Sequence, residues 1–282
     1  MNQKVSNSQH ESRATRLEIY DGPLGPTTFT VMTMNLWGSN HWDERREGVA
    51  ALMRARRPDV LCVQELTAWS RQVIDESLVG HRRAEGPHPG WERASNIWWR
   101  ADLFECEGQG VEDIDELGDH RGLFWVRLRP LTGPDRDVVV ATAHLTWQGD
   151  TAELHDLRNR RVPQARQICE HLDRLAAGGP VVFSADLNDV SPAQYAMAGR
   201  GFCDAWAALG QGMPATSPVP ASLSYGGLWD VSKQLVRVAT GFDVQFSKGA
   251  VRVRGAEVVD FYHLGRAVSD HFPVQATYTL GI

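Results

Sequence analysis

Lysine is scarce in this chain. Only three of its 29 basic residues are lysines, no stretch concentrates lysine with arginine, and the formal net charge is −6. An acidic chain without a basic run lacks the broad positive surface by which proteins bind nucleic acid regardless of sequence. Composition therefore argues against a non-specific nucleic-acid binder, although a local basic groove is compatible with an acidic total.

Long apolar stretches are missing as well. The sequence contains no run of about 18 apolar residues, so we expect no membrane-spanning helix and no membrane partner. Residues 1–16 are polar and lack the apolar segment of a secretion signal, which predicts a disordered N-terminal tail. No repeat or linker divides the rest, so residues 17–282 are expected to form a single domain.

Cysteine is also rare. The four cysteines show neither C-x-x-C spacing nor the density of a disulfide framework. We therefore expect reduced thiols in a cytoplasmic protein. The four are Cys62, Cys106, Cys169 and Cys203.

The stretch PVVFSADLNDVSP, residues 180–192, carries the clearest chemical signal. Val181 to Phe183 form a short apolar run, typical of a strand covered on both faces. Asp186 and Asn188 follow, two positions apart, so they point the same way from an extended backbone. A carboxylate beside an amide can hold water, a metal ion or a phosphate oxygen. The alternative is an Asx-rich turn.

The same combination of an apolar strand and a polar end recurs along the chain. Each such residue, taken alone, is more often structural than catalytic. Ligand and catalytic groups nevertheless gather at strand ends in layered α/β folds, and here eight positions share that placement. They are Asn35, Glu65, His144, Asp186, Asn188, Asp243, Asp270 and His271.

Helical periodicity and turn residues predict the elements between these strands. Apolar positions on one face predict helices from Asn40 or Asp43 to Pro58 and from Arg160 or Pro163 to Ala177. The acidic residues 102–119 predict a solvated hairpin or loop. A further strand is expected over residues 257–263.

The chemistry of the eight positions is complementary. Glu65, Asp270 and Asn35 supply hard oxygen ligands suited to Mg²⁺ or Mn²⁺. Histidines beside carboxylates can act as acid, base or stabiliser of phosphate charge. A phosphoester transition state carries spread negative charge, which a divalent cation and a histidinium stabilise together.

The order of these motifs resembles the endonuclease/exonuclease/phosphatase superfamily, to which deoxyribonuclease I-like nucleases belong. The resemblance implies an α/β four-layer sandwich, with two packed mixed β-sheets flanked by helices on both outer faces. It rests on TMNLW, PDVLCVQE, ATAHL, SADLND, GFDVQF and VSDHFPV, within residues 30–275.

The resemblance also implies a metal site and a site for the attacking water. Glu65 is similar to the family's principal metal ligand, and Asn35 and Asp270 match positions that complete or flank the metal. Asp186 matches the residue that orients or deprotonates the attacking water. Asn188 matches the amide that holds this water or a phosphate oxygen.

The remaining matches concern the phosphate. His271 resembles the donor to the scissile phosphate, with Asp243 fixing its ring and keeping it protonated. His144 matches a position near the leaving-group oxygen, and Arg121 a phosphate-facing arginine. Trp37 stands where many nucleases of the family carry an acid, so the number of metal ions stays open.

The substrate is less constrained. The acidic segment, the few lysines and the lack of a basic arm favour a small phosphorylated compound over duplex DNA. A nuclease acting on DNA or RNA is the alternative, and a non-catalytic module binding a phosphate ligand is a second one. Tryptophans near the motifs are candidates for ring stacking, although ordinary packing is commoner. They are Trp37, Trp42, Trp147 and Trp229. A monomer is compatible with the sequence.

Overall fold

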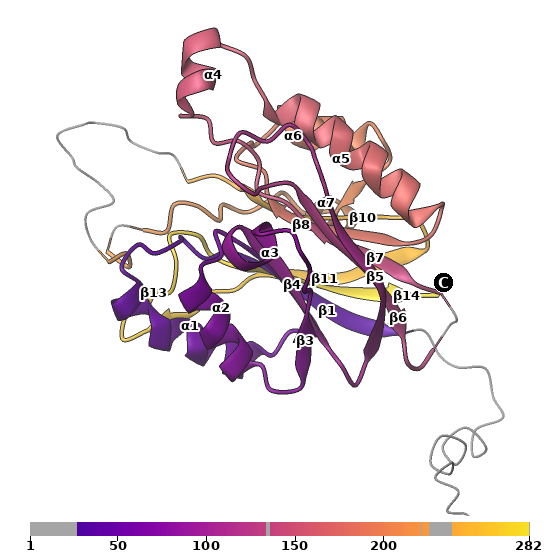
Figure 1. Ribbon diagram of the computed structural model, residues 1–282, viewed down its shortest axis with the longest axis horizontal. Coiled ribbons are helices and arrows are strands. Elements are labelled where there is room, and N and C mark those ends of the chain that lie inside the picture. Colours follow the sequence, from indigo (N-terminus) through magenta and orange to yellow (C-terminus); the bar gives the residue numbers. More distant parts are fainter. Residues whose placement is uncertain (1–26, 134–135, 221, 226–238, 282) are drawn as a thin grey trace, which may run out of the picture.

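The computed structural model describes residues 27–133, 136–220, 222–225 and 239–281, so the expected N-terminal tail and Trp229 lie outside the described residues. Two six-stranded mixed sheets form the centre of the molecule (Figure 1). The first sheet has the order β11 (Val251–Val258), β14 (Val274–Leu280), β1 (Thr28–Asn35), β2 (Val60–Gln64), β4 (Ser95–Arg100), β3 (His81–Arg83). The second has the order β5 (Phe104–Glu112), β6 (Leu123–Pro130), β7 (Val138–Thr142), β8 (Val181–Asp186), β10 (Asp243–Lys248), β9 (Cys203–Asp204).

Helices cover both outer faces of this pair of sheets. Helices α1 (Trp42–Arg56) and α2 (Ala68–Ser77) pack on the first sheet, and α5 (Arg161–Ala176) and α6 (Pro192–Ala198) pack on the second (Figure 1). The predicted four-layer sandwich is therefore confirmed. The short elements are α3 (Gly90–Arg93), α4 (Thr151–Asp156), α7 (Ala205–Ala208), β12 (Tyr262–His263) and β13 (Arg266–Ala267). Among the described residues, no helix is both long and apolar enough to span a bilayer.

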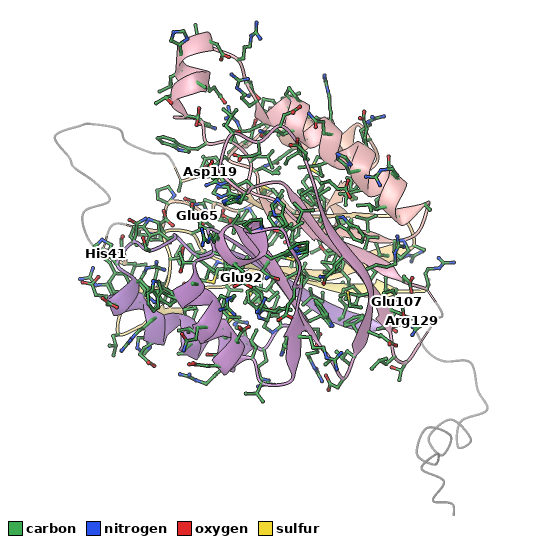
Figure 2. All side chains as sticks on the ribbon, in the orientation of Figure 1. His41, Glu65, Glu92, Glu107, Asp119 and Arg129 are labelled. Atoms are coloured by element: carbon green, nitrogen blue, oxygen red, sulfur yellow. The ribbon has the colours of Figure 1, made fainter. Side chains whose placement is uncertain are left out.

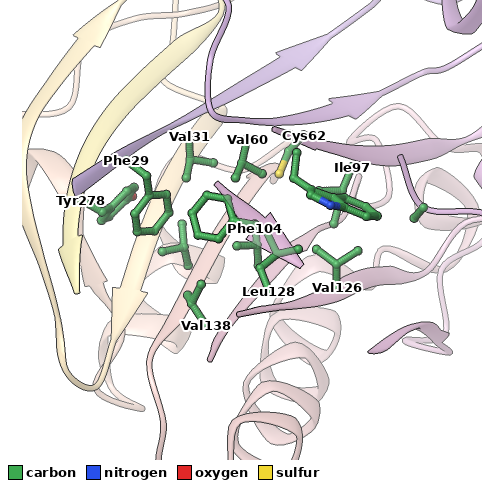
Figure 3. Close-up of a cluster of buried hydrophobic side chains, with 14 of the residues drawn as sticks. Phe29, Val31, Val60, Cys62, Ile97, Phe104, Val126, Leu128, Val138 and Tyr278 are labelled. Carbon is green, nitrogen blue, oxygen red and sulfur yellow. The ribbon is translucent and has the colours of Figure 1, made fainter. Parts of the chain in front are cut away.

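The main core lies between the sheets (Figure 3). Strands covered on both faces need apolar residues at successive positions, which explains runs such as the VVVAT of β7. Phe29 of β1 and Phe104 of β5 meet edge to face across this core, with ring centroids 5.4 Å apart. A polar link also joins the layers, because Nε2 of Gln245 donates to the carbonyls of Val31 and Val274 at 2.9 and 3.1 Å.

The strand directions bring the polar ends together. β1 runs parallel to β2, and β7 runs parallel to β8 after the crossover through α5. β10 is antiparallel to β8, so its first residue, Asp243, pairs with the last residue of β8, Asp186. Beyond β7, His144 forms a parallel bridge with Asp186. One edge of the sandwich therefore collects these ends.

The structure corrects one expected strand and defines the acidic segment. The strand expected over residues 257–263 was wrong, because the pairing strand is β11, Val251–Val258, and a register shift between Val253 and Gly255 disturbs its alternation. The acidic segment, for which a hairpin or a loop was expected, supplies the edge strand β5 of a hairpin with β6 and the first part of the loop that joins the two strands. Charged side chains are typical of such edges because they discourage pairing with other chains.

Candidate active site

The eight polar strand ends lie together at the edge described above. Asn35 and Glu65 come from the first sheet, His144, Asp186, Asn188 and Asp243 come from the second, and Asp270 and His271 precede β14. Direct contacts link seven of them, and Asp270 joins through its neighbour Ser269, whose Oγ donates to the Asn35 carbonyl at 2.7 Å. Figure 2 shows Glu65 between His41 and Asp119 on this side of the molecule.

Asn35 connects the two sheets through its side-chain amide. Its Nδ2 donates to Oε1 of Glu65 at 3.1 Å and to Oδ2 of Asp186 at 2.9 Å. The backbone N–H of Trp37 donates to Asn35 Oδ1 at 2.8 Å, which fixes the orientation of the amide. Glu65 adopts a left-handed backbone conformation with φ 53°, a strain that folded proteins keep mainly at functional positions.

Glu65 and Asp270 are two carboxylates that affect each other electrostatically, and His271 only partly offsets their charge. Burial raises the pKa of Glu65; the hydrogen bond from Asn35 opposes this rise, and the charge of Asp270 adds to it. Burial also raises the pKa of Asp270, against the effect of His271. Within the described ranges, no lysine or arginine forms an ion pair with either carboxylate, and Glu65 Oε2 receives no hydrogen bond. These oxygen donors fit a hard divalent cation such as Mg²⁺ or Mn²⁺.

Asp186 contacts four other residues of the site. Its Oδ2 accepts from Asn35 and lies 3.6 Å from Nε2 of His144 and 3.7 Å from Nδ1 of His271. Its Oδ1 accepts the backbone N–H of Asn188 at 2.8 Å. Asn188 has φ 47°, and asparagine tolerates this conformation better than most residues.

Asp243 and His271 form a buried pair. Nδ1 of His271 lies 2.9 Å from Oδ2 of Asp243. Burial alone lowers the pKa of His271, but the carboxylates of Asp243, Asp270 and Asp186 together raise it well above its usual value. Ligand atoms of Asp186, Asp243 and His271 lie within 4.8 Å of one another and would suit a metal ion, yet the proton on His271 Nδ1 already fills the contact with Asp243.

His144 has the opposite character. Burial lowers its pKa to about 3, Asp186 partly opposes this, and the positive charges of Arg121 and His271 reinforce it. Nδ2 of Asn188 donates to His144 Nε2 at 2.9 Å and to the Leu145 carbonyl at 3.0 Å. The neutral ring therefore carries its hydrogen on Nδ1, which is buried without a partner in the described part of the chain.

Arg121 lies close enough to affect His144 electrostatically, but its nearest charged partner is another residue. Its Nη1 is 3.5 Å from Oε1 of Glu116, whose side chain is 2% exposed. Thr146, two residues after His144, also donates to Glu116 at 3.3 Å. The acidic segment thus anchors Arg121 beside the site, a connection that sequence reasoning missed.

Sequence reasoning also missed Arg45, which is fully buried in α1. Its guanidinium donates to the carbonyls of Asn40 (2.7 Å), Leu36 (2.9 Å) and Val268 (2.9 Å), and also to those of Trp37 and Gly38. These bonds tie the loop after Asn35 to the segment that leads to Asp270. The signal was present, because Arg45, Val49 and Leu52 share the buried face of the helix.

Thr216 is the second missed residue. Its Oγ1 donates to Oδ2 of Asp243 at 2.5 Å, and its carbonyl accepts the N–H of Phe272 at 2.8 Å. It therefore holds Asp243 and the chain beside His271 from one position. It lies in an irregular loop of proline, glycine and serine, where no periodicity marks a buried residue.

Comparisons with known proteins agree with this architecture. The sequence matches the Endonuclease/Exonuclease/phosphatase family over residues 32–271. A search of curated proteins finds no match. Among solved structures, that of D. rerio TDP2 complexed with single strand DNA product is 18% identical, with TM-score 0.74 over 89% of this chain and 99% of that one.

Two further structures share the fold. A mannosyl-6-phosphatase of Bacteroides thetaiotaomicron is 18% identical, with TM-score 0.69 over 88% of this chain and 98% of that one. The human Nocturnin catalytic domain with bound sulfate is 17% identical, with TM-score 0.66 over 90% and 94%. At these identities the structures show a common fold alone. Because the family match spans most of the sequence, this chain belongs to the endonuclease/exonuclease/phosphatase family.

Proposed function

We propose that this chain is a divalent-metal-dependent phosphoesterase that hydrolyses a phosphomonoester or phosphodiester bond of a small phosphorylated compound. Members of its family are hydrolases of phosphoester bonds that use divalent metals. The proposal depends above all on one observation. Carboxylates, amides and two histidines of opposite protonation state come from both sheets and meet, buried and hydrogen-bonded, at one edge.

In this proposal Glu65 and Asp270, with Asn35 beside them, hold Mg²⁺ or Mn²⁺. The raised pKa values of both carboxylates reflect burial and negative charge that a bound cation would offset. When bound, the ion supplies positive charge to the phosphate oxygens.

The other residues act on protons and on phosphate charge. Asp243 keeps His271 protonated through Nδ1, which leaves the Nε2–H of His271 to donate to a phosphate oxygen. Asp186 takes the proton of the attacking water. Both amide hydrogens of Asn188 are committed to His144 and Leu145, so only its Oδ1 can accept from that water. In this proposal Asn188 therefore contacts the water rather than a phosphate oxygen.

His144 enters the scheme as a neutral ring beside the leaving-group oxygen. Its Nε2 accepts from Asn188 and lies 3.6 Å from Asp186 Oδ2, so this edge of the ring faces the site, whereas Nδ1 is buried. Arg121 contributes positive charge nearby, held by Glu116 rather than free to follow a substrate. Together they favour departure of the alcohol from phosphorus.

A small substrate is favoured by the charge of the whole chain. The formal net charge is −6 and only three of the 29 basic residues are lysines, which disfavours a polyanion. A nuclease remains the second candidate, because one structural neighbour carries a single strand DNA product. The four cysteines are free, which supports a reducing compartment, and we propose the cytoplasm.

The test is a panel of phosphomonoesters, phosphodiesters and oligonucleotides, incubated with purified protein and Mg²⁺ or Mn²⁺. We expect turnover of small phosphorylated compounds that stops with EDTA and in Asp186→Ala. Cleavage of DNA or RNA ahead of every small ester would select the nuclease. Binding without hydrolysis of any ester, with either metal, would replace the enzyme by a binding module.

A further inference from the structure

An open pocket of about 700 Å³ lies between the loop that joins β1 to α1 and the start of α2. Its walls come from the two segments that directly follow the metal-site residues Asn35 and Glu65. One wall is the loop after β1 with the first turn of α1, including Ser39, Trp42 and Asp43, and the other is Trp69 in the first turn of α2. The loop passes close to Glu65, since a Cβ built on Gly38 would lie 3.5 Å from Glu65 Oε2.

The pocket is held in shape before any ligand arrives. Arg45 binds the backbone of the loop and also lies 5.6 Å from the ring centroid of Trp42. On the opposite wall, Thr67 and Ser70 form a capping box that fixes the start of α2 around Trp69. A preformed site of this kind binds without first ordering its loops.

The groups that face the pocket have unused binding capacity. Trp69 is 67% exposed, which is unusual for an indole with no structural role. The Asp43 carboxylate and the Arg46 guanidinium stand one helical turn apart, yet neither forms a hydrogen bond or ion pair with the described residues. Glu44 adds a second carboxylate, shared with His41 at 2.8 Å.

These groups select one kind of ligand. Carboxylates only accept hydrogen bonds and a guanidinium only donates them, so the ligand must do both, as hydroxyl groups do. Indole faces pack against the C–H faces of a saturated ring. Two acids at the pocket disfavour a chain of further phosphates.

We propose that this pocket binds the hydroxyl-rich, uncharged ring of the substrate, such as a sugar bearing a single phosphate. The inference deepens the proposed function, on which it rests, because the phosphate would then reach the metal site past Gly38. It assigns Trp69 and Asp43 to substrate selection rather than to the chemical step.

The test compares hexose phosphates with methyl phosphate, which is too small to fill the pocket, and with a mononucleotide and a short single strand of DNA. For the wild type we expect kcat/KM to be at least tenfold higher on the best hexose phosphate than on methyl phosphate. Trp69→Ala and Asp43→Asn should lose this preference through KM, while activity on methyl phosphate stays within twofold. Trp147→Ala is the matched control, since Trp147 is a half-exposed tryptophan on the loop before α4, and it should keep the preference.

The inference is overturned if both pocket variants keep the hexose preference, if Trp147→Ala loses it instead, or if the nucleotide or DNA ranks first. Turnover of methyl phosphate without a hexose preference would remove this inference and leave the proposed function standing. In the reverse case the pocket binds a hexose but the protein hydrolyses no ester. To test it, Asp186→Ala is titrated with free hexose while the indole N–H signals are monitored by NMR. If no ester is hydrolysed but hexose shifts the Trp69 signal, the pocket stands and the proposed reaction falls; no shift would remove both.

Discussion

Nδ1 of His271 lies 2.9 Å from Oδ2 of Asp243, and both side chains are buried. The charge of Asp243, with those of Asp270 and Asp186, outweighs the burial that would otherwise deprotonate the ring. Asp243→Asn keeps the shape of the side chain but removes its charge. We expect kcat to fall on the order of 100-fold, because the histidine then loses the proton it donates to phosphate.

A kinetic cycle with His271→Ala tests whether the two residues act as one unit. The double variant should be hardly slower than either single variant. Thr216→Val serves as the milder comparison, since it removes the hydroxyl that donates to Asp243 Oδ2 at 2.5 Å, together with its longer contacts to the Asp243 N–H and the Thr240 carbonyl. It should cost roughly tenfold, in line with the weight of one bond to a charged group. Multiplying losses in the double variant would show that Asp243 acts independently of His271.

The sequence predicted the layers and the polar strand ends because both depend on local patterns. The apolar runs of β1, β2, β7 and β8 mark strands buried on two faces, and the polar residue that follows each run is visible in the chain itself. That these ends meet follows from parallel strands sharing one edge. The acids, amides and histidines of the site could thus be named in advance.

What the sequence did not reveal depends on contacts between distant segments. Thr216 reaches Asp243 across 27 positions from a loop without periodicity. The protonation states of His144 and His271 differ because of their surroundings in space, although both follow similar apolar runs. The shift of the expected strand from residues 257–263 to β11 arises from a bulge that breaks the alternation on which strand prediction relies.

Substitution of Arg45 should weaken the loop that follows Asn35. Arg45→Lys keeps the positive charge but replaces a planar fork that reaches five backbone carbonyls with a single ammonium. We expect a loss of stability on the order of 3 kcal/mol and a lower kcat, because the loop beside Glu65 loosens. Urea unfolding and kcat/KM measure the two effects. Arg54→Lys, on an exposed position of the same helix, is the control; an equal effect of both changes would contradict the role of Arg45.

Substitution of Asp270 should remove metal binding without lowering the stability of the metal-free protein. Its carboxylate is buried near other acids, so Asp270→Asn should leave the metal-free protein at least as stable as the wild type. Mg²⁺ or Mn²⁺ should raise the melting temperature of the wild type, because an ion at 100 times its Kd adds about 2.7 kcal/mol to the free energy of unfolding. Neither ion should change the melting temperature of the variant appreciably. Thermal unfolding with and without EDTA measures this, with Asp43→Asn as an exposed control. If neither metal changes the melting temperature of the wild type, the proposed metal site is contradicted.

His144 predicts a specific loss of stability in acid. Burial lowers its pKa from 6.5 to about 3. Below pH 6.5, His144 is therefore protonated in the unfolded chain but stays neutral in the folded protein. Stability contributed by the neutral ring is therefore complete above pH 6.5 and falls as the pH drops toward 3, by about 1.4 kcal/mol for each pH unit. His144→Gln removes this titration, so its stability should fall less than that of the wild type between pH 7 and pH 5, by roughly 2 kcal/mol. Urea unfolding at the two pH values measures the difference, and His155→Gln, exposed on α4, should follow the wild type. Parallel losses in the wild type and His144→Gln would mean that His144 accepts a proton in the folded protein, and its assignment as a neutral ring beside the leaving group would then fail.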